Sequence, residues 1–152
     1  MEGLESILAK HPFFAGFAAE HGQLVAACAR NHRYEVGEYL FREGGPANEF
    51  FLIRHGQVAL EIGAPGTAPI VFATLDQGDL VGASWLVPPY RWLYDARAVT
   101  LTRAIGIDAA CLRAKCEADH HLGYEMMKRF LPALVQRLHA TQLQILDVYG
   151  KR

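Results

Sequence analysis

The sequence predicts a mainly β fold with helices at both ends, a β-roll or jelly-roll barrel followed by a long C-terminal helix. Three observations support this prediction. Apolar residues recur at helical spacing over 1–31, alternate with polar residues in short segments over 32–108, and return to helical spacing over 109–152. Glycine-containing turns separate the short middle segments, which is typical of a sandwich or roll. We expect the three ranges to form one structural domain, since 51% of the 152 residues are hydrophobic and can build a single core.

The composition argues against several classes of protein. The formal net charge is -1 and no dense basic cluster occurs, which is not the pattern of a nucleic-acid-binding domain. No apolar run is long enough to span a membrane, and the N-terminus lacks the basic and apolar regions of a signal peptide. The three cysteines are widely spaced and do not indicate a disulfide framework. We therefore expect a soluble cytoplasmic protein.

Two helical segments are expected before the β region. Helical turns run over 3–19, interrupted by Pro12, and a second helix runs over 21–29. Neither segment carries residues that suggest chemistry. Short strands with Gly or Pro turns between them follow, including a hairpin around His55-Gly56. The strands are expected at 34–36, 39–41, 50–53, 58–62, 70–75, 96–101 and 104–107.

The C-terminal part of the chain is expected to form two helices. Residues 109–118 suit a short helix with Asp108 as N-cap, and 122–149 suit one long helix that Pro132 should kink. Two apolar rows run along the long helix, and a small β domain can cover only one of them. We therefore expect a homodimer in which the long helix packs against its copy. The two rows contain Leu122, Met126, Phe130, Leu134 and Leu138, and Met127, Leu131 and Val135.

The main candidate site is the segment 78–98, GDLVGASWLVPPYRWLYDARA, which we term the cassette segment. It begins with a Gly-Asp turn, and Gly82 and Pro88-Pro89 follow. The aromatic residues Tyr90, Trp92 and Tyr94 come next. Strand-like segments lie on both sides of the cassette segment. A short turn or helix between strands gathers free backbone N–H groups and a helix N-terminus. The segment is therefore a natural place for a small anionic ligand.

Four sequence motifs occur within this order of helices, strands and C-terminal helices. They are LAKHPFF at 8–14, YEVGEYLFREG at 34–44, FLIRHGQV at 51–58 and DQGDLVG at 76–82. Together they resemble the cyclic nucleotide-binding domain family, which includes the sensor halves of catabolite activator and Fnr-type regulators. The resemblance covers residues 4–149. It implies a β-roll with a phosphate-binding cassette at residues 78–98 and a regulatory role in signal transduction.

The cassette segment departs from the family pattern at both of the side chains that bind the nucleotide in that family, which we term the two anchors. In that family a glutamate holds the ribose 2′-hydroxyl, and an arginine pairs with the cyclic phosphate beside helix N–H groups. Here Gly82 matches the family glycine, but Ala83 stands in the glutamate position. Counts forward from Gly82 and back from the next strand both place Trp92 in the arginine position. Arg91 and Arg97 are nearby candidates for the phosphate contact, but one step along an extended segment turns a side chain to the other face.

The resemblance therefore implies that cyclic AMP or cyclic GMP binding is weak or altered. Loss of a charge-assisted contact typically costs about 1.5–3 kcal/mol, or roughly one to two decades in affinity. The aromatic side chains of the segment either stack on a ligand or pack the pocket shut. Ser84 either donates to a ligand oxygen or caps a helix. The candidate ligand-binding residues are Gly82, Ala83, Ser84, Trp85, Arg91 and Trp92.

Metal, haem and enzyme sites are weaker hypotheses. Cys116 and His120 are four residues apart, close to Cys111 and His121, but the cysteine spacing is not of a zinc type and the segment crosses a helix junction. Haem-binding family members use axial histidines, for which His11 or His55 would be the candidates, although a histidine in a hairpin turn is usually an ordinary turn residue. No G-x-S-x-G, HExxH or P-loop pattern occurs. We expect no metal, no cofactor apart from a cyclic nucleotide ligand, and no enzymatic activity.

Two functions remain open at this point. The first is a stand-alone ligand-sensing domain whose output reaches a protein partner in trans. Family regulators continue past the long helix into a helix-turn-helix domain, and this sequence stops at Arg152, so no DNA-reading element is expected. The second is a ligand-free interaction or scaffold module whose pocket the aromatic residues close.

Overall fold

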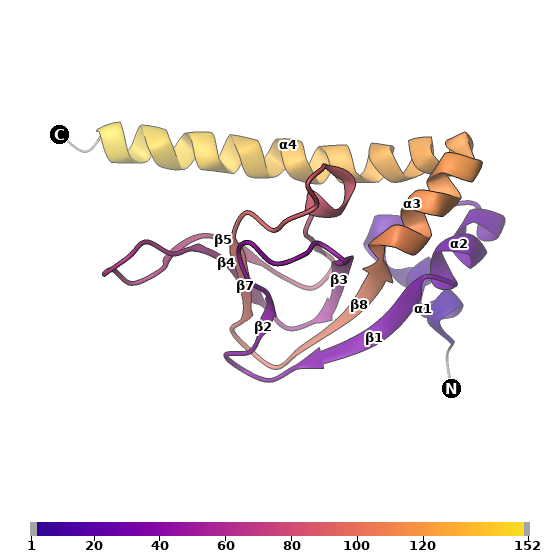
Figure 1. Ribbon diagram of the computed structural model, residues 1–152, viewed down its shortest axis with the longest axis horizontal. Coiled ribbons are helices and arrows are strands. Elements are labelled where there is room, and N and C mark those ends of the chain that lie inside the picture. Colours follow the sequence, from indigo (N-terminus) through magenta and orange to yellow (C-terminus); the bar gives the residue numbers. More distant parts are fainter. Residues whose placement is uncertain (1–2, 151–152) are drawn as a thin grey trace.

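The computed structural model describes residues 3–150 and confirms the predicted fold class (Figure 1). Two four-stranded antiparallel sheets face each other as a roll, with strand orders β1-β8-β3-β6 and β2-β7-β4-β5. The first sheet contains β1 (Ala29–Tyr34), β8 (Thr102–Asp108), β3 (Glu49–His55) and β6 (Leu80–Val81), and the second contains β2 (Tyr39–Phe41), β7 (Asp95–Ala98), β4 (Val58–Ile62) and β5 (Ile70–Leu75). The helices are α1 (Leu4–Lys10), α2 (Ala19–Ala26), α3 (Ala109–Ala118) and α4 (His120–Gly150), with single 3₁₀ turns η1 (Pro12–Phe14) and η2 (Ser84–Leu86).

The N-terminal elements differ from the prediction in their boundaries. The first helix ends at Lys10 and not at residue 19, because Pro12 begins a separate 3₁₀ turn. Strand β1 starts at Ala29, five residues before the predicted start, since its pairing with β8 runs from Ala29–Ile107 to Tyr34–Thr102. Its sequence ARNHRY does not alternate apolar with polar residues, so periodicity could not reveal it.

Strand β3 divides the core into two parts. Adjacent residues on a strand face opposite sides, and here both are large aromatics. Phe50 faces the helices, with its ring centroid 4.9 Å from that of Phe130 in α4. Phe51 faces the interior of the roll, where its ring stacks 6.2 Å from Phe41 of β2. One core therefore joins the sheets to each other, and the other joins them to α4.

A disulfide bond between Cys28 and Cys111 corrects the expectation from cysteine spacing. Cys28 lies just after α2 and Cys111 lies in the first turn of α3, 83 residues later. The same junction carries the predicted N-cap, since the Asp108 side chain accepts a hydrogen bond of 2.8 Å from the Cys111 N–H. Spacing could not indicate the bond because β1 and β8 bring the two cysteines together only in the folded chain.

Helix α4 runs along one side of the roll, and its C-terminal half extends over the β4–β5 hairpin (Figure 1). It spans 31 residues and runs through Pro132 as one helix, without a visible break at the predicted kink. Leu122, Met126 and Phe130 are buried, whereas the apolar residues after Phe130 are at least partly exposed. No helix of residues 3–150 combines the length and the apolar character needed to cross a membrane.

Candidate ligand-binding site

The cassette segment turns sharply at Gly82, directly after β6. Gly82 has a φ of +95°, a conformation that residues with a Cβ rarely adopt. A Cβ at this position would also lie 2.7 Å from two ring carbons of Trp92. The glycine is therefore required both by the backbone turn and by the close approach of the Trp92 indole.

Trp92 belongs to the interior of the roll. Its side chain is only 4% exposed, and its ring stacks on Phe41 with centroids 3.6 Å apart and planes 8° apart. Its main chain is held by two hydrogen bonds, from its own N–H to the Gly45 carbonyl and from the Gly44 N–H to its own carbonyl. Trp92 thus places a packed aromatic ring directly beside Gly82.

Trp85 connects the short helix η2 to the C-terminal helices. It is fully buried, stacks 5.0 Å from Phe50 and lies 5.4 Å from Phe130, measured between ring centroids. Its carbonyl accepts a hydrogen bond from the Arg113 guanidinium of α3, which lies 4.2 Å from the ring centroid of Tyr90. Its indole N–H has no hydrogen-bond partner among the described residues. Trp85 therefore ties the cassette to α3 and α4 as part of the core.

Ala83 and Ser84 leave the start of η2 without a side-chain cap. The N-cap residue is Ala83 and not Ser84, and it makes no side-chain hydrogen bond. The Ser84 carbonyl accepts the Val87 N–H at 3.3 Å. The alternative role of Ser84 as N-cap is therefore wrong. That the Ser84 hydroxyl donates a hydrogen bond to a ligand stays a prediction.

The two arginines nearest to Trp92 in the sequence point elsewhere. Arg91 is exposed and contacts the Gly44 carbonyl at 3.4 Å. Arg97 makes two hydrogen bonds of 3.0 Å to the buried carboxylate of Glu61, and these bonds raise the pKa of Arg97. The structure therefore brings Gly82 and Trp92 together but directs neither arginine to them.

A third arginine, Arg137 of α4, contacts the cassette segment from outside it and was not predicted from the sequence. Its guanidinium donates a hydrogen bond to the carbonyl of Leu80, two residues before Gly82, and burial lowers its pKa. The side chain lines a cavity of about 390 Å³ between β5, β6 and α4, together with Thr74 and Asp79. Helical spacing could have indicated this position, since Arg137 follows the buried Phe130 by seven residues and lies on the same helix face.

The interior of the roll beside Trp92 also contains an ionised carboxylate, that of Glu49. Burial by itself raises the pKa of Glu49, but hydrogen bonds from His32 at 2.8 Å and Arg30 at 3.0 Å outweigh it and hold the pKa at about 2. Glu49 and Trp92 line the same cavity of about 280 Å³. The Arg30 guanidinium, 3.0 Å from this carboxylate, offsets its negative charge.

The sequence-based metal hypothesis does not match the arrangement of the helices. Cys116 belongs to α3 and His120 begins α4, so the two residues do not share one helix face as their spacing suggested. Cys111 is bonded to Cys28 and is not a free thiol. Within residues 3–150, no three His, Cys, Asp or Glu side chains are grouped so that they could hold a metal ion.

Known proteins share this architecture and part of this sequence. The family model described as "Cyclic nucleotide-binding domain" matches residues 31–119. A structure from Geobacter metallireducens, named for cyclic nucleotide binding, is 27% identical, with a TM-score of 0.78 over 91% of this chain and 100% of its own. A cyclic nucleotide-binding domain from Methylobacillus flagellatus has 19% identity and a TM-score of 0.78, over 95% of this chain and 82% of its own. The regulatory subunit of a cAMP-independent protein kinase A from Trypanosoma brucei has 14% identity and a TM-score of 0.68, over 94% of this chain and 49% of its own.

Proposed function

The chain belongs to the cyclic nucleotide-binding domain family, and from this premise we propose that it is a regulatory sensing domain with weak or altered affinity for cyclic AMP and cyclic GMP. The observation that carries this proposal is the position of Trp92. Its indole packs on Phe41 and against Gly82, at the position where the family arginine would meet the cyclic phosphate. On the cassette segment itself, Arg97 pairs with Glu61 and the exposed Arg91 contacts the Gly44 carbonyl, so neither guanidinium is directed to Gly82.

Nucleotide binding at this site carries two costs. The phosphate has no cassette guanidinium to pair with, and the ribose hydroxyl has no carboxylate to accept its hydrogen bond, because Ala83 offers only a methyl group. The ligand must also displace the Trp92 ring, and the loss of one aromatic pair alone costs about 0.5–1.5 kcal/mol. Arg137 of α4, which donates to the Leu80 carbonyl two residues before Gly82, supports altered rather than absent anion binding.

A second candidate function, a ligand-free interaction module, is favoured by the burial of the two tryptophans. Trp85 is fully buried and Trp92 is 4% exposed, so both rings contribute to the core and not to an open cleft. The same fold occurs in the Trypanosoma brucei kinase subunit described as cAMP-independent. In this case the domain would act through its surface alone.

Restoring the family anchors separates the two functions. The double variant Ala83→Glu, Trp92→Arg supplies the missing carboxylate and guanidinium, and we expect its affinity for cyclic AMP to exceed that of the unmodified protein about tenfold or more. Isothermal titration calorimetry with cyclic AMP and cyclic GMP measures this difference. Trp92→Phe is the matched control, because it keeps an aromatic ring and adds no charge.

Each outcome of the titration supports one interpretation. Weak saturable binding by the unmodified protein, strengthened in the double variant, supports the sensing domain. The absence of binding by the unmodified protein to either nucleotide supports the interaction module. Tight binding by the unmodified protein would contradict both, since Trp92 would then leave its place without a measurable cost. Circular dichroism establishes that the variants are folded.

We further propose that the domain forms a homodimer through α4 and passes its signal to a protein partner in trans. Leu131, Leu138 and Ile145 are exposed and recur every seven residues, the spacing of a coiled-coil seam. Leu134 and Val148 lie three residues after the first and the last of these positions, where such a seam places its second apolar row. A second copy of α4 offers the same stripe and would cover it.

The proposed location is the cytoplasm. Disulfides are rare in reducing compartments, so the state of the Cys28–Cys111 bond in cells bears directly on this proposal. Thiol labelling of the protein in rapidly quenched cell extracts reports that state. Two additional labelled cysteines relative to the purified oxidised protein support a reducing location, and full protection of both argues against it.

A further inference from the structure

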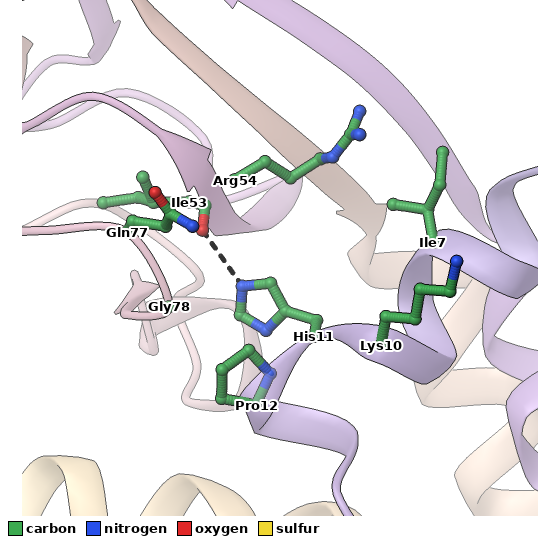
Figure 2. Close-up of a pocket in the computed structure, with 8 residues that line it drawn as sticks. All are labelled: Ile7, Lys10, His11, Pro12, Ile53, Arg54, Gln77 and Gly78. Carbon is green, nitrogen blue, oxygen red and sulfur yellow. Dashed lines mark hydrogen bonds between the residues drawn. The ribbon is translucent and has the colours of Figure 1, made fainter. Parts of the chain in front are cut away.

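A further pocket lies between α1, β3 and the turn before β6, and neither Gly82 nor Trp92 lines it. Its volume is about 330 Å³. Three segments that are distant in the sequence meet around it, namely α1 with the two residues that follow it, β3 and the 77–78 turn (Figure 2). We term it the Arg54 pocket. Its lining residues are Ile7, Lys10, His11, Pro12, Ile53, Arg54, Gln77 and Gly78.

The wall of the Arg54 pocket is held in place by His11. Its Nδ1 accepts the Phe13 N–H at 3.2 Å, and its Nε2–H donates to the Ile53 carbonyl at 3.0 Å. The same carbonyl accepts the Gly78 N–H at 2.9 Å, so three segments converge on one oxygen. Burial lowers the pKa of His11, which keeps the imidazole neutral and its two hydrogen bonds intact at neutral pH. The pocket is therefore preformed and does not depend on a charged histidine.

The Arg54 guanidinium brings a positive charge to the pocket. Arg54 is partly buried, and its guanidinium makes no hydrogen bond and no ion pair with any residue of the described chain. Figure 2 shows the head groups of Arg54 and Lys10 on one side of the imidazole and the Gln77 amide on the other. The lining residues include no carboxylate. The nearest acidic influence on His11 comes from Asp79, whose carboxylate already accepts the Asp76 N–H at 2.8 Å.

We propose that the Arg54 pocket binds a small molecule that carries an oxyanion, a phosphate or a carboxylate group. A partly buried guanidinium offers two parallel N–H donors, which match two oxygens of such a group. Lys10 also lines the pocket, and the Gln77 amide supplies neutral donors. Ile7 and Pro12 provide an apolar surface for a short organic body attached to the anion. This site shares only Gly78 with the cassette segment and does not depend on the function proposed for that segment.

The test is a titration followed by ¹H–¹⁵N nuclear magnetic resonance, with inorganic phosphate as one probe and succinate as the other. We expect at least one probe to shift the backbone amides of Gln77 and Gly78 in a saturable manner. The probe that binds more tightly distinguishes a phosphate site from a carboxylate site. The variant Arg54→Gln should weaken that binding about tenfold or more, because it removes a charge-assisted pair.

Arg103→Gln is the matched control, since Arg103 is an exposed arginine of β8 in the same sheet. It changes the net charge equally and should leave the affinity unchanged. Lys10→Gln is a second variant of the pocket, and it keeps the proposal testable if Arg54→Gln does not fold. Equal weakening by the pocket and control variants would reduce the effect to general charge and overturn the proposal. Absence of saturable shifts with either probe, or shifts confined to Gly82, would overturn it as well.

Discussion

The two halves of α4 contain similar residues in opposite environments. In the first half, Leu122 and Met126 are fully buried and Phe130 is 2% exposed. In the second half, Leu138 is 60% exposed and Leu146 is 66% exposed. The apolar spacing is the same on both sides of Pro132, so the pattern alone identifies an apolar face without identifying what covers it.

The position of the roll explains this difference. The first half of α4 packs on the aromatic core around Phe50 and Trp85. The second half is attached to the sheets through hydrogen bonds to main-chain carbonyls, from Arg137 to Leu80 and from Gln144 to Phe72. Figure 1 shows this half reaching over the β4–β5 hairpin to the end of the helix. The first half therefore stabilises the domain, and the second half leaves most of its apolar residues exposed.

The largest expected effect is the loss of stability on truncating the buried half. Phe130→Ala removes a ring that contacts Phe13, Phe50 and Trp85, and comparable changes cost about 3–5 kcal/mol. Urea denaturation monitored by circular dichroism measures the free energy of unfolding. His139→Ala is the control from the exposed half, on the face that adjoins the proposed seam, and it should change the free energy of unfolding by less than about 0.5 kcal/mol. Equal losses in the two variants would mean that the second half is also packed in the monomer.

The next effect concerns association. Leu138→Glu places a charge in the centre of the proposed seam, where an unpaired buried carboxylate is strongly unfavourable. We expect the unmodified protein to be a dimer and the variant a monomer at micromolar concentration, with the monomer still folded. Size-exclusion chromatography with light scattering measures the mass, and His139→Glu is the control on the adjoining exposed face. A monomeric unmodified protein would refute the dimer.

The smallest effect is a pH-dependent one at the start of the buried half. The Asp119 carboxylate accepts hydrogen bonds from the backbone N–H groups of Leu122 and His121, at 3.2 and 3.1 Å. These bonds lower the pKa of Asp119 below 3.8, and the bond from Leu122 has the larger effect. A carboxyl whose pKa is lower in the folded state stabilises the fold above its unfolded pKa, and the contribution is lost as the pH falls through the folded pKa. Asp119→Ala should therefore lower the melting temperature slightly at pH 7, and by less as the pH falls well below 3.8. A difference that stays constant with pH would exclude this role of the carboxylate.

Local pattern predicted much of the fold. The β4 and β5 strands and helix α3 have the predicted boundaries, because turn residues and helix caps mark them within a few residues of chain. The two-residue strand β6 escaped prediction, since a strand this short has no period and is defined by its pairing with Phe51 and Leu52. The start of β1 escaped it for a related reason, because only β8 makes the segment a strand.

For the cassette, the sequence by itself determined which groups are present, namely Gly82, Ala83 and Trp92. Only the tertiary structure decided that the Trp92 ring packs on Phe41, that Arg137 reaches the cassette from α4, and that Arg54 borders a separate pocket. The physical reason is the range of the interactions. Turns, caps and periodic apolar faces act over a few residues, whereas the packing of rings and the placement of charges depend on segments that meet only after the sheets have paired.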